Sequence, residues 1–137
     1  MRIIGTGRAH PAKVVTNAML EGFLDTSDEW IRTRTGIQER RLISSERLED
    51  LATEAARKAI EDAGLTPADI DYIICSNVIN EYITPGLSCI IQGNIGAKCA
   101  CVDVNAACSG FIYALDMADD RIKSGKAKNI LVVAAEE

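Results

Sequence analysis

Long apolar runs are missing from this sequence of 137 residues. A membrane-spanning helix needs about 18 to 20 apolar residues in succession, so no such helix is predicted. The first residues, MRIIGTGRAHP, also lack the longer apolar stretch of a secretory signal. We therefore expect a cytosolic protein that has no membrane partner.

Clustered basic residues are missing as well. The net charge is -5, and the 15 Lys and Arg residues form no run. Because a nucleic-acid-binding domain normally presents a clustered basic face, no nucleic-acid partner is expected. The densest basic group consists of Arg32, Arg34, Arg40 and Arg41. Its charge could bind one phosphorylated small molecule, but it is too limited to bind a polyanion along its length.

Histidine is almost absent, since His10 is the only one, and there is no C-x-x-C pair. Zinc sites usually combine closely spaced Cys and His ligands, so no metal is predicted. A redox or zinc protein that uses the cysteines remains an alternative. The simpler interpretation is that the cysteines are reduced and fill small core positions. The sequence has five of them: Cys75, Cys89, Cys99, Cys101 and Cys108.

Helical periodicity is clear in three segments. Apolar residues at three- and four-residue steps predict a helix from Leu48 to Ala63 that ends at Gly64. A second helix is predicted from about Pro85 to Gly96, with Leu87, Ile90, Ile91 and Ile95 directed inward. A third ends at Gly125, and its predicted inner face consists of Phe111, Leu115, Ala118 and Ile122.

Short apolar runs alternate with these helices. They predict buried strands at residues 72–76, 99–104 and 129–135, and a first strand at residues 3–7. Residues 8–47 are polar and are predicted to form loops with one short helix near residues 27–32. The alternation indicates an α/β fold whose sheet is covered on both faces. Because the chain stops directly after a strand that should be buried, we expect it to be truncated.

Cys108 stands where an apolar strand gives way to a helix, among small residues that leave room for a substrate. The positive end of a helix dipole favours the thiolate form of a thiol, and backbone N–H groups at that end can stabilise an oxyanion. Cys108 is therefore a candidate nucleophile. The alternative is a small residue that fills a tight turn.

Trp30 is the only tryptophan, and it lies close to Arg32 and Arg34. An indole beside guanidinium groups can stack a heterocycle and hold phosphates, which together suit an adenine nucleotide such as coenzyme A. Trp30 could equally be a packing residue, and Thr26 or Ser27 a helix N-cap.

His10 and Asp103 are two further polar residues that could take part in catalysis, but simpler roles are expected for both. His10 precedes Pro11 in a predicted loop, where an exposed histidine is common, so a Cys–His catalytic pair is not favoured. Asp103 could orient a base, but hydrogen bonding to backbone in the turn after the strand is the expected role.

Two stretches together resemble β-ketoacyl-acyl-carrier-protein synthase III. The first comprises Ile4-Gly5-Thr6-Gly7 and the segment TSDEWIRTRTGIQERR at residues 26–41, and the second is VDVNAACSGF at residues 102–111. The resemblance runs along the whole chain. It implies a thiolase-like α/β/α/β/α sandwich, of which residues 1–137 would be the N-terminal half-domain, and a homodimer.

The resemblance also implies an activity. A short acyl-CoA would acylate Cys108, and malonyl-acyl-carrier-protein would then lose carbon dioxide and attack the acyl group, which starts fatty-acid synthesis. No cofactor is implied, because coenzyme A enters as the substrate thioester. Trp30, Arg34 and Thr26 match residues that contact coenzyme A. Thr84 aligns with a position where some members place a bulky aromatic that closes the partner subunit's acyl pocket, so longer or branched acyl groups would fit.

One departure from the family, besides Thr84, leaves alternatives open. The family's catalytic histidine and asparagine lie in a C-terminal half that this chain does not contain, so no condensation is expected of these residues alone. One alternative is therefore a catalytically incomplete fragment that binds coenzyme A or a protein. Another is a sister condensing enzyme that resembles 3-hydroxy-3-methylglutaryl-CoA synthase or a polyketide enzyme.

Overall fold

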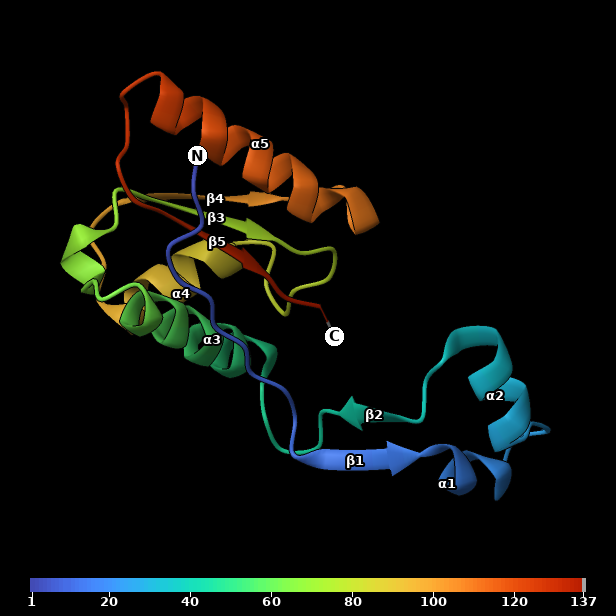
Figure 1. Cartoon of the computed structure of the whole chain (residues 1–137). Coiled ribbons are helices and arrows are strands. Elements are labelled where there is room, and N and C mark those ends of the chain that lie inside the picture. The colour runs from blue at the N-terminus through green and yellow to red at the C-terminus, as the bar shows by residue number, and fades with distance from the viewer. Residues whose placement is uncertain (137) are drawn as a thin grey trace. The chain divides into compact units, whose positions relative to one another are not determined.

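The computed structural model describes residues 1–136. The chain divides into two compact units (Figure 1). The first comprises Met1–Ala9 together with the residues from Arg47 onward, and the second is His10–Glu46. Each unit is described by itself. None of the helices in the described residues has the length and apolar character needed to cross a membrane.

A three-stranded parallel sheet forms the centre of the first unit. Its strands are β3 (Tyr72–Ser76), β4 (Ala100–Val104) and β5 (Ile130–Ala134), in the order β4-β3-β5. Ile74 of β3 pairs with Val102 of β4 and with Val132 of β5. The three apolar runs of the sequence that were predicted as strands at residues 72–76, 99–104 and 129–135 are thereby confirmed, with ends that differ by at most one residue.

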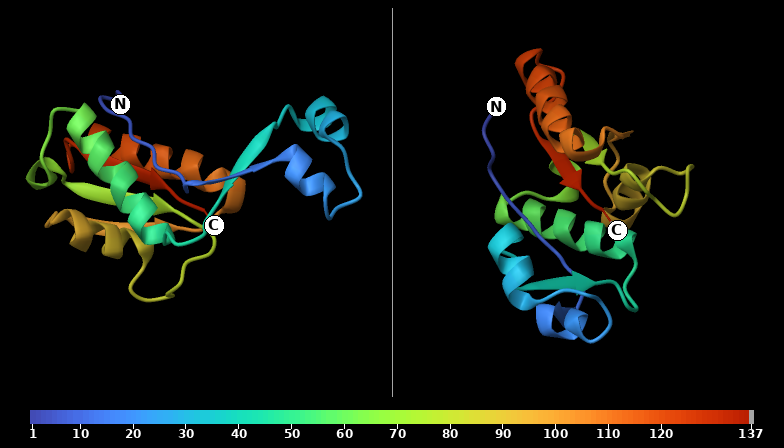
Figure 2. Two further views of the ribbon diagram at one scale, coloured as in Figure 1. Left: turned by 90° about the horizontal axis from the view of Figure 1, so that it is seen from below. Right: turned by 90° about the vertical axis from the view of Figure 1, so that its right-hand side faces the viewer.

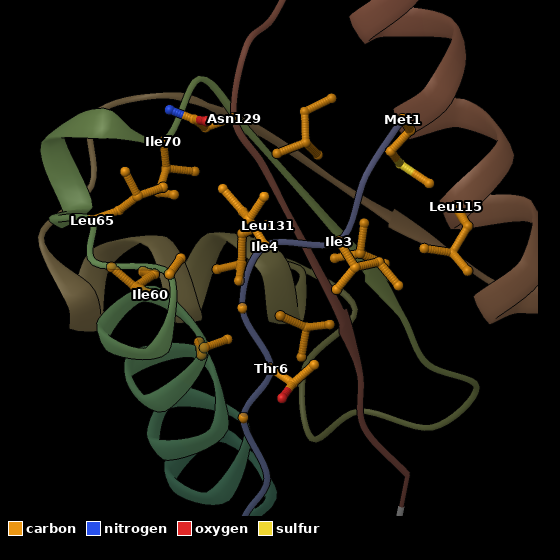
Figure 3. Close-up of a pocket in the computed structure, with 18 of the residues that line it drawn as sticks. Met1, Ile3, Ile4, Thr6, Ile60, Leu65, Ile70, Leu115, Asn129 and Leu131 are labelled. Atoms are coloured by element: carbon orange, nitrogen blue, oxygen red, sulfur yellow. The ribbon is translucent and has the colours of Figure 1, made fainter.

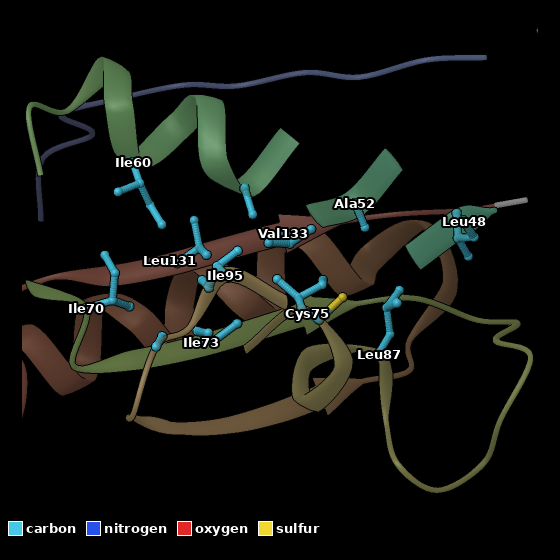
Figure 4. Close-up of a cluster of buried hydrophobic side chains, with 13 residues drawn as sticks. Leu48, Ala52, Ile60, Ile70, Ile73, Cys75, Leu87, Ile95, Leu131 and Val133 are labelled. Carbon is cyan, nitrogen blue, oxygen red and sulfur yellow. The ribbon is translucent and has the colours of Figure 1, made fainter. Parts of the chain in front are cut away.

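Helices cover both faces of this sheet, as predicted. Helices α3 (Leu48–Asp62) and α4 (Leu87–Ile95) lie on one face, and α5 (Gly110–Lys123) lies on the other (Figures 1 and 2). Successive strand residues point to opposite faces. Ile73 and Cys75 therefore pack with α3 and α4 (Figure 4), whereas Ile74 packs with α5.

Helix α3 has the amphipathic pattern that its sequence predicts. Leu48, Ala52, Ala56 and Ile60 are buried along one side, at four-residue steps. Gly64 follows the helix in the left-handed region, with a φ of 67°. Since a residue with a side chain is strained there, glycine is the residue that best ends the helix at this point.

The inner face of α5 differs from the prediction. The helix buries Gly110, Ala114 and Ala118, whereas Phe111 is 43% exposed. Small residues at four-residue steps allow the helix axis to lie close to the sheet. The larger Leu115 and Ile122 are shifted to the side of this contact and are half-buried.

The predicted strand at residues 3–7 is wrong. This segment forms no regular element, and the backbone N–H of Thr6 donates to the carboxylate of Asp62 at 2.8 Å instead of joining a strand ladder. A Cβ on Gly5 would lie 2.4 Å from the Ala59 carbonyl oxygen, and one on Gly7 would lie 2.2 Å from that of Ala55. The two glycines therefore allow close packing on α3 and are not part of a nucleotide-binding loop.

The second unit contains more regular structure than predicted. Strands β1 (Lys13–Thr16) and β2 (Glu39–Leu42) form an antiparallel ribbon, and α1 (Asn17–Glu21) directly follows β1. The predicted short helix is confirmed as α2 (Asp28–Thr35), which ends at Gly36 with a φ of 74°. The ribbon and α1 escaped prediction because four- and five-residue elements in a polar segment carry little periodic signal.

Candidate functional site

Cys108 lies on an exposed turn between β4 and α5. Between the end of β4 at Val104 and the first residue of α5 lie Asn105, Ala106 and a single 3-10 turn, Ala107–Ser109. Ala107 has a φ of 47°, and it is the one non-glycine residue with a positive φ in residues 1–136. Alanine in this region is strained, and such strain is concentrated at functional sites, where surrounding structure holds it in place. The turn therefore presents the thiol to solvent in a constrained backbone.

Gly110 anchors this turn to the sheet. It is buried, and a Cβ at this position would lie 2.3 Å from the Ser76 hydroxyl oxygen at the end of β3. The sequence suggested that Gly110 leaves space for a substrate. Instead, its missing side chain lets the start of α5 approach β3, which fixes the position of the residues just before it.

Asp103 has a different role from the predicted one. Its carboxylate oxygens accept the backbone N–H groups of Leu87 and Ser88, each at 2.7 Å, and the Asn77 amide at 3.1 Å. Asp103 thus caps the start of α4 and does not bond the turn that contains Cys108. The sequence contained one sign of this role. The N-cap position of α4 is Gly86, which has no side chain to accept the first N–H groups of the helix, so an acceptor from elsewhere was needed.

The loop at residues 77–86 is tied to the strand that leads to Cys108. The Asn105 amide donates to the Val78 carbonyl oxygen at 3.3 Å, and the Asn77 backbone N–H donates to the Val104 carbonyl oxygen at 3.3 Å. Thr84 lies exposed in the same loop, as does Ile83, which is fully exposed. The candidate acyl-pocket residue and the candidate nucleophile therefore belong to one unit, on directly connected segments.

The three predicted coenzyme A residues lie together at α2 in the other unit. The Arg34 guanidinium lies 4.4 Å from the centre of the Trp30 ring, which is the geometry of a cation–π contact. Trp30 is 53% exposed, so it is not the packing residue that the alternative reading described. Ser27 is the N-cap, and its hydroxyl accepts the Trp30 backbone N–H at 3.1 Å, whereas Thr26 precedes it and is half-buried.

The basic group of the sequence separates into different roles. Arg40 is half-buried and donates to the Asn17 side chain at 2.8 Å and to the Val15 carbonyl oxygen at 3.2 Å. Asn17, which is 1% exposed, also donates to Asp28 and to the Ile37 carbonyl oxygen, each at 2.8 Å. Arg40 therefore stabilises the second unit, while the exposed Arg34 remains available for a ligand.

The remaining candidates are dispersed. His10 is exposed in the second unit, whereas Cys108 belongs to the first. Cys75 is buried, and burial raises its pKa to about 12. Cys99 and Cys101 are partly buried, but Cys89 is exposed, so its prediction as a core residue is wrong. Among residues 1–136, no three His, Cys, Asp or Glu side chains are grouped in a way that could hold a metal ion.

A cavity of about 350 Å³ lies in the first unit, and it does not include Cys108 (Figure 3). Ile3 and Ile4 of the N-terminal segment, Ile60 of α3 and Leu115 of α5 point into it, beside Leu131 of β5. Its lining is mainly apolar, and it contains none of the predicted site residues. This cavity is therefore separate from the candidate nucleophile.

Solved condensing enzymes share this arrangement of a parallel sheet between helical layers. The 3-oxoacyl-[acyl-carrier-protein] synthase III of Aquifex aeolicus VF5 matches with a TM-score of 0.95 and 51% identity, over 98% of this chain and 44% of that chain. The priming β-ketosynthase of the R1128 polyketide pathway matches with a TM-score of 0.94 and 40% identity, over 98% of this chain and 41% of that chain. The chain therefore has the thiolase-like α/β fold of condensing enzymes.

Sequence comparison defines the family within this class. Residues 102–137 match the family described as 3-oxoacyl-[acyl-carrier-protein (ACP)] synthase III. The curated β-ketoacyl-[acyl-carrier-protein] synthase III of Aquifex aeolicus is 50% identical over 137 residues, which are 99% of this chain and 44% of that protein. The chain belongs to the β-ketoacyl-acyl-carrier-protein synthase III family, and it spans less than half the length of the curated relatives that it matches.

Proposed function

We propose that this sequence is part of an enzyme that begins fatty-acid synthesis by condensing a short acyl-CoA, such as acetyl-CoA, with malonyl-acyl-carrier-protein. The observation that carries this proposal is the exposed Cys108 on the constrained turn between β4 and α5, inside the segment that matches the family. The curated relatives favour this reading over a sister condensing reaction, because they carry the synthase III name.

The proposed chemistry has two stages. The Cys108 sulfur attacks the thioester carbonyl carbon of the acyl-CoA, the bond from that carbon to the coenzyme A sulfur breaks, and coenzyme A leaves as the thiol. Malonyl-acyl-carrier-protein then loses carbon dioxide, and the resulting carbanion attacks the acyl carbon and releases the Cys108 sulfur. Dividing the reaction through an acyl-cysteine replaces one difficult step with two easier ones.

The residues of this chain account for the first stage only. The family resemblance assigns decarboxylation to a histidine and an asparagine that have no counterpart in the matched segments. The one histidine here, His10, is exposed and belongs to a different unit from Cys108. We therefore expect residues 1–137 alone to accept an acyl group without completing a condensation, and without any added cofactor.

For coenzyme A, we propose a contact surface at α2. The half-exposed indole of Trp30 offers a stacking surface for adenine, and Arg34, already placed over that ring, offers positive charge for a phosphate. Thr26 precedes the N-cap of the same helix. The contact between Trp30 and Arg34 orders both side chains before a nucleotide arrives, which reduces the entropy cost of binding.

For the acyl group and the assembly, we propose a homodimer in which the loop at residues 77–86 meets the partner subunit. Large apolar side chains are exposed on this loop and on the first turn of α5, which is unusual for a surface that stays in water. They are Val78, Ile79, Tyr82, Ile83, Phe111, Ile112 and Tyr113. Size-exclusion chromatography with light scattering tests the dimer. The small side chain of Thr84 on this loop favours acceptance of acyl groups longer than acetyl.

Acyl transfer is tested by incubating the 137-residue chain with radiolabelled acetyl-CoA and digesting the product with trypsin. We expect the label in the peptide that begins after Lys98 and contains Cys108. Because this peptide also contains Cys99 and Cys101, the decisive variant is Cys108→Ala, which should abolish labelling while Cys99→Ala retains it. Label that persists in Cys108→Ala contradicts the assignment.

Nucleotide binding is tested separately by calorimetric titration with coenzyme A. We expect Trp30→Ala and Arg34→Ala each to weaken binding by about 5- to 30-fold, which corresponds to the loss of about 1 to 2 kcal/mol. Phe23→Ala is the matched control, because Phe23 is also an exposed aromatic of the second unit, at 71% exposure. Equal affinities of all three variants would place the nucleotide elsewhere.

A further inference from the structure

Two cysteine thiols meet on the face of the sheet that carries α4. Cys89 lies in the first turn of α4, Cys101 lies on β4, and their sulfur atoms are 3.2 Å apart. The sulfurs would have to approach each other by only about 1 Å to reach the disulfide bond length of about 2.05 Å. Both cysteines are free thiols in this structure.

We propose that Cys89 and Cys101 form an oxidative modification site, a dithiol that a hydroperoxide converts into a disulfide. The site is separate from Cys108, and it does not depend on the acyl-transfer function proposed above. It also differs from a metal site, since no third ligand is grouped with the pair in the described part of the chain.

The reaction proceeds in two balanced steps. The Cys89 sulfur attacks one oxygen of the hydroperoxide, so an S–O bond forms and the O–O bond breaks, and the departing oxygen takes the proton that the Cys89 thiol gives up. The Cys101 sulfur then attacks the Cys89 sulfur, the S–O bond breaks, and the leaving hydroxide takes the Cys101 proton and becomes water. With hydrogen peroxide, two thiols lose two electrons, and the peroxide is reduced to two waters.

The surroundings of the two thiols assign the order of these steps. Cys89 is exposed, so a peroxide can reach it, whereas Cys101 is partly buried. Burial, and secondarily a hydrogen bond with Cys89, raise the pKa of Cys101 to about 11, which keeps it protonated near neutral pH. Cys101 is therefore a poor first nucleophile, but it stands directly beside the Cys89 sulfur and can attack once that sulfur is oxidised.

The other cysteines lack this combination. Cys75 is buried, and Cys99 has a pKa raised chiefly by burial. Cys108 is exposed, but it lies beyond the end of β4, whereas Cys101 is the second residue of that strand. Within the described residues, the contact between Cys89 and Cys101 is the one sulfur–sulfur contact at hydrogen-bonding distance.

The experiment treats the reduced 137-residue chain with one equivalent of hydrogen peroxide and then with iodoacetamide under denaturing conditions. We expect the number of alkylated cysteines to fall from five to three, because two of the five are then joined. The intact mass of a sample that is not alkylated should fall by the mass of two hydrogens. Trypsin cuts after Lys98, between the partners, so fragmentation of the linked peptides identifies the pair. A reductant should restore all five.

Matched variants complete the test. Cys89→Ser and Cys101→Ser should each abolish the cross-link, whereas Cys99→Ser and Cys108→Ser should retain it. Because Cys101→Ser alters a partly buried position, a second measurement uses phenylarsine oxide, which bridges neighbouring thiols and should bind one equivalent per wild-type chain and none per Cys89→Ser chain. Five free thiols after peroxide, a sulfinic acid without a cross-link, or a disulfide that uses another cysteine would each overturn the proposal.

Discussion

The carboxylate of Asp103 on β4 accepts the backbone N–H of Leu87, the first residue of α4, at 2.7 Å. Its other oxygen accepts the N–H of Ser88 at 2.7 Å. A carboxylate at a helix N-terminus satisfies N–H groups that lack partners within the helix, and it interacts favourably with the helix dipole. One side chain thus joins the strand that leads to Cys108 to the helix that follows the loop of Thr84.

We expect Asp103→Ala to lower the free energy of unfolding by about 1.5 to 3 kcal/mol, because hydrogen bonds to a charged group are lost and the N–H groups of α4 lose their acceptor. Urea unfolding followed by circular dichroism measures the change. Asp120→Ala, which removes an exposed carboxylate on α5, is the control and should change stability by less than about 0.5 kcal/mol. Equal stability of the two variants would show that the cap is dispensable.

The approach of Gly110 to Ser76 gives a second prediction. Gly110→Ala places a methyl group 2.3 Å from the Ser76 hydroxyl oxygen and should cost about 1 to 3 kcal/mol through overpacking. We also expect a changed rate of Cys108 alkylation, because the turn before α5 must shift. Unfolding in urea and timed alkylation measure the two effects.

Two controls separate this clash from a general effect of alanine. Gly93→Ala lies in α4, where an added Cβ meets nothing within 4 Å, so it should stabilise the helix by up to about 1 kcal/mol. Adding Ser76→Ala to Gly110→Ala should recover part of the lost stability, because it removes the hydroxyl oxygen at 2.3 Å. The nearest atom of residue 76 is then its Cβ at 3.4 Å, an ordinary van der Waals distance. A double variant no more stable than Gly110→Ala would argue against the clash.

The sequence predicted the sheet-containing unit better than the unit at residues 10–46. The run Ile73-Ile74-Cys75 is continuously apolar because β3 is buried on both faces, and such a run carries its own signal. Residues 3–7 also contain an apolar start, Ile3-Ile4, yet they form no strand, and the Thr6 backbone N–H bonds the Asp62 carboxylate. A strand depends on a partner that no local pattern specifies.

In the candidate site too, some contacts follow from local sequence spacing and others depend on packing between elements. The i,i+4 spacing of Trp30 and Arg34 predicts that they meet once the segment is helical, and the structure places them 4.4 Å apart. Asp103 and Leu87, or Cys89 and Cys101, are brought together by the packing of α4 on β4. Contacts of this kind join separate elements, and they have no period or motif by which a single sequence could reveal them.

The buried side chain of Asn17 gives a third prediction, which concerns the second unit alone. Its amide group bonds Asp28, Arg40 and the Ile37 carbonyl oxygen, and it therefore links α1 to α2 and to β2. Asn17→Ala should destabilise this unit by about 1 to 3 kcal/mol, because buried polar partners are left unsatisfied. The fluorescence of Trp30, the only tryptophan, reports on the unfolding of this unit.

Gln38→Ala is the control for Asn17→Ala, because Gln38 is an exposed amide in the same unit. The control should shift the fluorescence transition by less than about 0.5 kcal/mol. A circular dichroism signal dominated by α3 and α5 should respond less to Asn17→Ala than Trp30 fluorescence does. If the two signals shift equally, the two units unfold together, and the effect of Asn17 is not local.

Glu46 provides a dependence on pH. Its carboxylate accepts the backbone N–H of Ala12 at 2.7 Å and those of Ser44 and Ser45 at 3.1 Å each. These hydrogen bonds, with that of Ala12 the strongest, lower the pKa of Glu46 from 4.5 to about 2. A carboxylate whose pKa is lowered by folding stabilises the folded state above its unfolded pKa and loses that contribution as the pH falls through the folded value.

We therefore expect Glu46→Gln to be less stable than wild type at neutral pH, with a difference that shrinks as the pH falls from 4.5 to about 2. Thermal unfolding followed by Trp30 fluorescence at a series of pH values measures it. Glu39→Gln, an exposed carboxylate on β2, is the matched control in the same unit. If the stability difference between wild type and Glu46→Gln stayed constant from neutral to acidic pH, the charge of the Glu46 carboxylate would not be what stabilises its contacts with Ala12 and Ser44. Because Glu46 is only partly buried, solvent screens much of its charge, so we expect a pH-dependent shift in the unfolding midpoint and no loss of the fold.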